Sequence, residues 1–384
     1  MFRRKKKTTE IKKPDSRFTS SLDRRLAANF DWFMFAMIVL MILIGLVNLY
    51  SATRTGAHAD AFNTQLRWSI IGIVFLVVAF VINYRLYDAI AYWIYATMII
   101  LLMAVLLFGP TINNANRWLS FGGISFQPSE LAKVGLVMAL AKYLAANKVP
   151  HGYNIRELLI PAAIIAGPSL LVLMEPDLGT ALVMILISGS MLLFNGVRKR
   201  TLIGLFALAA SFAPIAWFYV LKEYQKNRIL TLLDPNRDPQ GTGYHIKQSL
   251  IAIGSGKFFG KGYLNGTQNK LSFLPEHHTD FVFSVFAEEW GFIGCLILLL
   301  LYFAIIVWSM TISMHSKDRF AAFMAVGLSA IIFWHVFINI GMVIGIMPVV
   351  GMPLPFMSYG RSSLMTMMIV VGLLLNISSR RYMF

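Results

Sequence analysis

The sequence predicts an all-α integral membrane protein with ten transmembrane helices and a large extracytoplasmic loop between helices seven and eight. Three observations lead to this fold class. Of the 384 residues, 57% are apolar and only 14% are charged, which is too little polar surface for a soluble globule of this length. The apolar residues form runs long enough to cross a bilayer. The basic residues collect at the ends of alternate runs, as they do in the cytoplasmic loops of membrane proteins.

Each long apolar run is interpreted as one transmembrane helix, because about 20 helical residues cross the roughly 30 Å hydrocarbon core. The fourth and sixth runs are shorter and contain polar residues. Residues 1–30 precede the runs as a basic tail, and residues 31–381 form one ten-helix domain with its large loop at 221–279. The ten runs begin near Asp31, Leu66, Tyr87, Leu131, Leu158, Gly179, Thr201, Phe281, Ala321 and Ser362.

The distribution of charge predicts that both termini lie in the cytoplasm. The tail and the short loops on its side of the membrane are rich in Lys and Arg, whereas the opposite short loops carry few. The loop at 221–279 is also basic, but long loops are translocated largely regardless of charge. The formal charge of +16 is therefore assigned to contacts with anionic lipid headgroups, and no nucleic-acid partner is expected. A single cysteine, Cys295, excludes an intrachain disulfide framework and a Cys-based zinc cluster.

Two stretches between the runs cannot be regular helix. Residues 347–360 contain three prolines and two glycines, and residues 113–128 are similarly polar and irregular. At membrane depth such backbone must be covered by protein or line a wet cavity. Both stretches are expected on the outer side, together with the large loop.

Ionisable residues near the outer ends of two runs are candidates for a polar site. Glu130 and Lys133 are three residues apart and share a helix face. They either neutralise each other inside the bundle or help to shape a polar cavity, and these roles do not exclude each other. Asp177 stands at the start of the sixth run, where a carboxylate can cap the helix or serve the site.

The large loop supplies the remaining candidates. Residues 241–263 indicate a short helix followed by a Gly-rich loop with Lys257 and Lys261, which could hold a pyrophosphate, although no nucleotide-binding motif is present. Residues 274–281 bring Glu276, His277, His278 and Asp280 together without the ligand spacing of a transition-metal site.

Asp280 lies where the large loop meets the eighth run. Thr279 as cap and Asp280 in the first helical turn is one interpretation of this position. On a helix, Asp280 and Glu288 would be roughly 12 Å apart, beyond the about 6.5 to 9.5 Å of paired glycosidase carboxylates. A two-carboxylate hydrolase is therefore disfavoured.

Several motifs, in this order, resemble the SEDS family of shape, elongation, division and sporulation proteins, which includes RodA, FtsW and SpoVE. The resemblance covers nearly the whole chain and is closest to the elongation members, the RodA group. Two positions depart from the family pattern: Arg361 replaces a usual glycine, and Lys257 stands where many members have glycine. The motifs are Asn-Arg-Trp-Leu (116–119), Gln-Pro-Ser-Glu-Leu-Ala-Lys (127–133), Glu-Pro-Asp-Leu-Gly-Thr (175–180), Gly-Tyr-His-Ile-Lys-Gln-Ser (243–249), Leu-Pro-Glu-His-His-Thr-Asp-Phe (274–281) and Pro-Leu-Pro-Phe-Met-Ser-Tyr-Gly-Arg-Ser-Ser (353–363).

The resemblance implies a peptidoglycan glycosyltransferase of the bacterial plasma (inner) membrane that polymerises lipid II and releases undecaprenyl pyrophosphate during cell elongation. It implies that Asp280 is the catalytic residue. It also implies that a divalent cation, Mg or Mn, supports activity, although the spacing of residues in the sequence does not identify the ligands of this cation. It also implies the elongation machinery as a partner, with a class B penicillin-binding protein whose anchor packs on the eighth and ninth helices.

A diphosphate leaves as a stable anion, so one general base suffices for this transfer. The residues expected to bind the substrate are Arg117, Glu130, Lys133, Asp177, Lys257, Lys261, Ser358 and Ser362. Two other functions stay open from sequence: a flippase or transporter for lipid II, and a noncatalytic scaffold for the transpeptidase. The inner halves of the helices are nearly uncharged, which argues against a flippase. A scaffold would leave the many motifs on the outer side unexplained.

Overall fold

The computed structural model describes residues 29–54, 60–112, 115–121, 124–239, 241–267 and 279–381. Nearly all of its regular structure is helical, which agrees with the predicted fold class. The longer helices are α2 (Trp32–Thr53), α3 (Asp60–Val81), α4 (Tyr84–Phe108), α5 (Pro128–Ala146), α6 (Leu159–Met174), α7 (Leu178–Asn195), α8 (Lys199–Ile215), α12 (Val282–Met314), α13 (Arg319–Val343) and α14 (Arg361–Arg380).

Eight of the described helices are long and apolar enough to cross a membrane. They are α2, α3, α4, α7, α12, α13, α14 and α8 with its extension to Tyr219. Helix α6 is apolar but has only 16 residues, and the 19-residue α5 carries a buried Glu and Lys. The chain is thus a multi-pass membrane protein, and the full count of ten crossing helices stays a prediction.

The predicted starts of the spans agree with the helices to within about three residues, except for the second. Helix α3 begins at Asp60, six residues before the expected Leu66. The first turns of α3 contain polar residues. Because the start was predicted from hydropathy, the part of the helix that precedes the apolar run was not detected.

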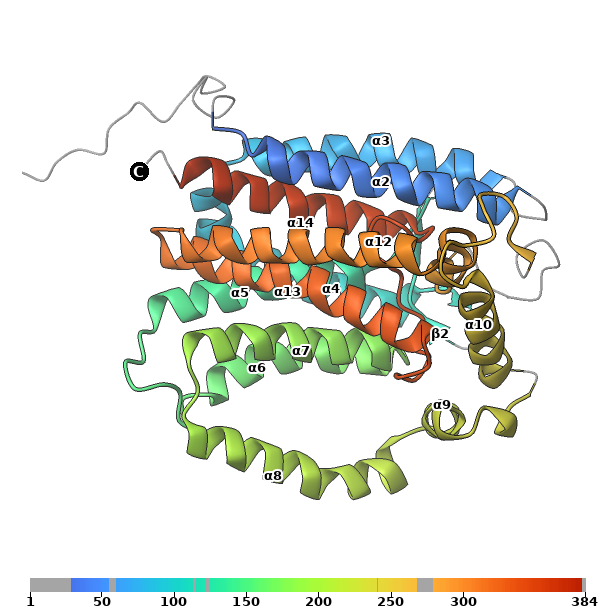
Figure 1. Cartoon of the computed structure of the whole chain (residues 1–384). Coiled ribbons are helices and arrows are strands. Elements are labelled where there is room, and N and C mark those ends of the chain that lie inside the picture. Colours follow the sequence, from blue (N-terminus) through green and yellow to red (C-terminus); the bar gives the residue numbers. More distant parts are fainter. Residues whose placement is uncertain are drawn as a thin grey trace, which may run out of the picture.

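Helices α13 and α14 form the centre of the bundle (Figure 1). In their most apolar windows, 78% and 89% of the residues are buried, against 6% for the window in Lys199–Tyr219. Helix α3 packs along α14, α4 along α5, and α12 along α13. Helix α8 lies apart from the other long helices (Figure 1), so its apolar side chains remain uncovered by protein.

The predicted large loop contains helices of its own. Helices α9 (Glu223–Leu233) and α10 (Thr242–Gly256), with the short 3-10 helix η3 (Pro235–Arg237) between them, gather at the end of the bundle opposite the last turn of α14 (Figure 1). After α10 the chain turns through Gly260, whose φ is +81°. A Cβ at Gly260 would lie 2.1 Å from the backbone oxygen of Glu289, so this close approach to α12 requires glycine.

The two irregular stretches differ from each other. The segment between α4 and α5 contains two short antiparallel strand pairs, β1 (Thr111–Ile112) with β2 (Ala115–Asn116) and β3 (Leu119–Phe121) with β4 (Ile124–Phe126). These strands are a departure from a purely α-helical chain. Residues 347–360 contain no helix, as predicted. Protein covers part of this segment, where Leu354, Phe356 and Met357 are buried, and another part lines a cavity.

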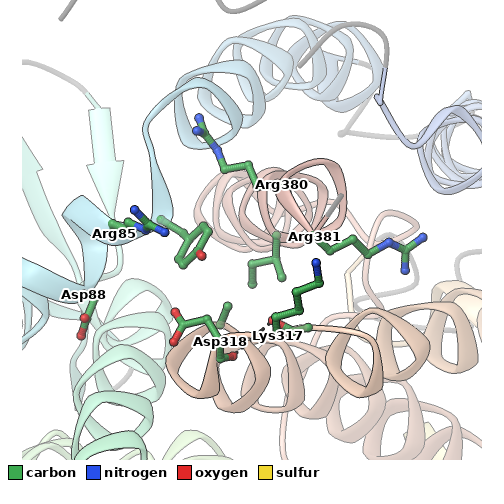
Figure 2. A pocket seen from close by; sticks show the side chains of 10 residues that line it. Arg85, Asp88, Lys317, Asp318, Arg380 and Arg381 are labelled. Atoms are coloured by element: carbon green, nitrogen blue, oxygen red, sulfur yellow. Dashed lines mark hydrogen bonds between the residues drawn. The ribbon is translucent and has the colours of Figure 1, made fainter. Parts of the chain in front are cut away.

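A charged pocket of about 480 Å³ lies at the end of the bundle where α14 ends. It is formed by the start of α4, the turn between α12 and α13, and the end of α14 (Figure 2). This is the end that the charge pattern predicts to face the cytoplasm. The charged side chains around it are Arg85, Asp88, Lys317, Asp318, Arg380 and Arg381.

Candidate active site

A second cavity, of about 540 Å³, lies at the opposite end of the bundle, where α9 and α10 gather. Four parts of the chain form its wall: residues 117–130, the start of α7, the residues before α12, and the segment that leads into α14. Five of the nine residues proposed from sequence line it: Arg117, Glu130, Asp177, Asp280 and Ser362.

Asp280 lies in the turn that precedes α12 and is partly exposed. The residue that begins α12 is Val282, its N-cap residue is Phe281, and no side chain caps it. The interpretation of Thr279 and Asp280 as cap and first helical turn is therefore wrong. The turn is instead fixed by Asn339 of α13, whose Nδ2 donates to the backbone oxygen of Asp280 at 2.9 Å.

Arg117 and Asp177 form an ion pair in the cavity wall, with Arg117 Nε and Asp177 Oδ2 3.9 Å apart. Arg117 also donates to the backbone oxygens of Glu175 and Pro176. Asp177 caps α7, since its carboxylate accepts from Thr180 N at 3.2 Å and from Thr180 Oγ1 at 2.9 Å. The capping and cavity roles considered for Asp177 thus occur together.

Glu175 is a buried carboxyl group that the sequence analysis did not single out. It has no exposed surface, and neither side-chain oxygen has a hydrogen-bond partner among the described residues. Burial, and then the charge of Asp177, raise its pKa to about 8, while Arg117 acts in the opposite direction. Glu175 is therefore mostly a neutral acid at pH 7.

Arg228 of α9 lies near the charged residues of the cavity wall, although it does not itself line the cavity. Burial lowers the pKa of Arg228, and its interactions with Asp177 and Asp280 act in the opposite direction. Its guanidinium lies 5.8 Å from the ring centre of Tyr224, whose hydroxyl donates to the backbone oxygen of Pro176 at 3.2 Å. Sequence reasoning missed Arg228 because only the fold of the large loop places α9 beside the cavity.

The Glu130–Lys133 pair is confirmed, with Lys133 Nζ 2.8 Å from Glu130 Oε1. Lys133 does not line the cavity but is fully buried behind Glu130. Its ammonium group also lies 2.7 Å from His335 Nε2 on α13. Because an ammonium group only donates, His335 Nε2 must accept, which places the ring proton on Nδ1 in the neutral imidazole. His335 was not expected, since a single histidine in an apolar helix has no distinguishing pattern.

The two candidate serines have different surroundings. Ser362 lines the cavity, and its Oγ accepts from the backbone nitrogen of Gln127 at 3.1 Å. Ser358 is buried outside the cavity wall, where its Oγ accepts from Leu354 N at 2.8 Å. Ser358 thus shapes the segment before α14, and this structure does not bring it to the cavity.

The two candidate lysines of the large loop lie away from the cavity wall. Lys257 is exposed at the end of α10. Lys261 Nζ lies 2.6 Å from Glu288 Oε1 and 2.7 Å from Thr267 Oγ1. Because Glu288 is fully buried in α12, this contact fixes the loop to the bundle and does not present the ammonium group to the cavity.

A divalent cation requires several oxygen or nitrogen ligands directed at one point. The described part of the chain contains no group of three or more His, Cys, Asp or Glu side chains that could hold one. Glu276, His277 and His278 lie outside the described residues. The described residues therefore show no cation site made of protein ligands alone, and no chemical step is assigned to a cation.

The chain matches the FtsW/RodA/SpoVE cell cycle protein family over residues 29–383. It is 43% identical to the peptidoglycan glycosyltransferase MrdB of Escherichia coli K12 over 350 residues, which cover 90% of this chain and 94% of MrdB. It is 31% identical to the peptidoglycan glycosyltransferase RodA of Treponema pallidum, with coverage of 93% and 99%.

Solved structures agree with these sequence matches. One is a chain from a peptidoglycan synthase complex described as coordinating polymerization and crosslinking, with a TM-score of 0.80, 31% identity, and coverage of 92% of this chain and 99% of that one. Another is the rod shape determining protein RodA of Thermus thermophilus, with a TM-score of 0.69, 30% identity, and coverage of 92% and 98%. The chain is therefore a member of the FtsW/RodA/SpoVE family.

Proposed function

We propose that this protein is a peptidoglycan glycosyltransferase that polymerises lipid II into glycan strands during cell elongation and releases undecaprenyl pyrophosphate. Its family and its similarity to MrdB and RodA support this activity. In the structure, the main support for this activity is the cavity of about 540 Å³, which is lined by Asp280 and by the cationic Arg117 and Arg361. A carboxylate and fixed positive charges are what a transfer with a diphosphate leaving group needs.

In the proposed reaction, the 4-hydroxyl oxygen of the acceptor sugar forms a bond to the anomeric carbon of the donor. The bond from that carbon to the diphosphate oxygen breaks, and the leaving diphosphate keeps the electron pair. The hydroxyl proton passes to the carboxylate of Asp280. Configuration at the anomeric carbon is inverted, because a single displacement occurs.

Asp280 suits the role of general base better than the other carboxylates in the cavity wall. Glu130 is bound to the ammonium group of Lys133, and Asp177 caps α7 and faces Arg117. Asp280 lies at the cavity on a turn that Asn339 holds through the backbone, and its carboxylate does not cap a helix.

We also propose that the cavity faces outward to receive the lipid-linked sugar and that both termini lie in the cytoplasm of a bacterium. The diphosphate would then lie at headgroup level while the prenyl chain stays in hydrocarbon. We further propose a class B penicillin-binding protein as partner within the elongation machinery, with its anchor on the outer faces of α12 and α13. Activity that depends on Mg or Mn is part of this proposal, with ligands that the described residues do not identify.

The decisive experiment is polymerisation of labelled lipid II by purified protein in detergent, with and without the cognate transpeptidase. Only a polymerase makes glycan chains when no membrane separates two compartments. A flippase or a scaffold leaves lipid II unchanged, and that result would refute the proposed activity. A parallel assay with Asp280→Asn shows whether the chains come from this cavity.

A further inference from the structure

Nearly every charged side chain that lines the cavity has an oppositely charged side chain of the protein near it. Five charged side chains line it: Arg117, Glu130, Asp177, Asp280 and Arg361. Glu130 is paired with Lys133 at 2.8 Å, and Asp177 with Arg117 at 3.9 Å. Asp280 is attracted to Arg228 of the neighbouring α9.

Arg361 is the exception. Within the part of the chain that the structure describes, its guanidinium group has no hydrogen bond, ion pair or ring contact. It is only partly exposed, so water does not surround it fully. A cation held in a cavity without a counter-ion attracts an anionic ligand, and a planar guanidinium with five N–H donors is suited to phosphate oxygens.

The backbone around Arg361 favours the same kind of ligand. Arg361 is the first residue of the 20-residue helix α14, and its N-cap residue, Gly360, has no side chain to cap the helix. The positive end of the helix dipole therefore lies at the cavity. Ser362 and Ser363, which follow Arg361, also line the cavity.

Arg361 occupies this position without backbone strain. Its φ is not positive, as expected for a residue in the first turn of a helix. Gly360 has a φ of 174°, which is extended backbone. The glycine usual at position 361 in SEDS sequences is thus not required by the conformation of this chain, and the arginine adds a charge to the site.

We propose that Arg361, together with the first turn of α14, binds a phosphate group of the diphosphate that links the donor sugar to its lipid. This inference rests on the proposed function for the identity of the ligand. When the bond to the anomeric carbon breaks, negative charge grows on the diphosphate, and Arg361 stabilises the departing group. A cation that acts in this way contributes both to binding of the donor and to the transition state.

The first test measures binding without catalysis. Inorganic pyrophosphate is titrated into purified full-length protein by calorimetry, with inorganic sulfate as a second anion. The variants are Arg361→Gln, Arg361→Lys and Arg361→Gly, the last restoring the residue usual in the family. Arg156→Gln is the matched control, because Arg156 is an exposed arginine that does not line the cavity.

We expect Arg361→Gln and Arg361→Gly to weaken pyrophosphate binding about tenfold or more, as for loss of a hydrogen-bonded charge pair. Arg361→Lys should retain part of the affinity, because it keeps the charge without the fork of donors. Arg156→Gln should bind as the wild type does. Wild-type affinity within about twofold in the Gln and Gly variants would overturn the proposal, as would equal binding of sulfate and pyrophosphate to the wild type.

Kinetics with lipid II provide the second test. We expect Arg361→Gln to raise KM and lower kcat, with partial rescue by Lys. The two proposals can fail separately. Pyrophosphate binding that depends on Arg361 in a protein that makes no glycan would refute only the polymerase, whereas full polymerase activity with unchanged KM in Arg361→Gln would refute only the role of Arg361.

Discussion

The side-chain amide of Asn339 donates a hydrogen bond to the backbone carbonyl of Asp280, with Nδ2 and O 2.9 Å apart. The same nitrogen donates to the backbone oxygen of Met352 at 2.6 Å. Asn339 is fully buried in α13. One buried side chain of α13 thus joins the turn before α12 to the irregular segment before α14. Both of these segments contribute to the cavity wall.

Replacement of Asn339 by Ala should reduce both stability and activity. It leaves the buried carbonyl oxygen of Met352 and the partly buried one of Asp280 without their donor. Loss of the partner destabilises a protein by about 1 to 3 kcal/mol for each buried unsatisfied group. It also frees the turn that carries Asp280. Thermal unfolding and lipid II polymerisation by the folded fraction measure the two effects.

Asn376→Ala is the matched control, because Asn376 is equally buried in α14 and its Nδ2 donates to the backbone oxygens of Ala79 and Phe80. It should lower stability to a similar degree and leave the activity of the folded fraction unchanged. Equal activity losses in the two variants would show that Asn339 has no specific effect on the site.

Replacement of Asp280 by Asn should abolish most of the activity while the protein still folds and binds its transpeptidase. The amide keeps the size of the side chain but cannot take a proton from the acceptor, and loss of a general base lowers rates by about 10²-fold to 10⁴-fold. The rate of lipid II polymerisation is the measurement. Gln variants of Glu276 and Glu288 test other carboxylates. If Asp280→Asn works within about tenfold of the wild type, another group is the base.

The organisation of the helices could be predicted from sequence because burial in lipid selects long apolar runs. The Glu130–Lys133 pair could be predicted as well, since residues three apart share a helix face. Contacts between distant parts of the chain have no such local signal. Lys261 and Glu288 are 27 residues apart, and their pairing depends on how the Gly-rich loop returns to α12.

Residues contributed by other elements were missed for the same reason. His335 lies 202 residues from the Lys133 that it contacts, and the surrounding sequence of α13 is apolar. Arg228 belongs to a segment that hydropathy identifies only as a polar loop. Hydropathy and spacing describe single elements, whereas these contacts depend on the packing of one element against another.

The buried Glu130–Lys133 pair should show strong coupling. Glu130→Gln leaves an ammonium group buried without its carboxylate, which typically destabilises a protein by about 3 to 5 kcal/mol. The double variant Glu130→Gln with Lys133→Met removes both charges and should unfold at a higher temperature than Glu130→Gln alone. A double variant that is no more stable than either single change would refute the coupling.

His335 should matter only while Lys133 is present. His335→Leu removes the acceptor at 2.7 Å from Lys133 Nζ and should lower stability in the wild-type background. His335→Gln, whose amide oxygen can accept the same hydrogen bond, should be tolerated better. In a Lys133→Met background, His335→Leu should have a much smaller effect, and an unchanged effect there would contradict a direct interaction.

Glu175 should make stability depend on pH. Its pKa rises from the ordinary 4.5 to about 8 in the folded protein, so the folded state binds its proton more tightly than the unfolded state does. The contribution of Glu175 to the free energy of unfolding is therefore greatest below about pH 4.5 and decreases as the pH rises towards 8. Glu175→Gln should match the wild type in unfolding temperature at pH 4, exceed it increasingly up to pH 8, and keep a constant advantage above. The exposed Glu157→Gln is the control. A difference between Glu175→Gln and wild type that does not change between pH 4 and pH 8 would show that folding does not raise the pKa of Glu175.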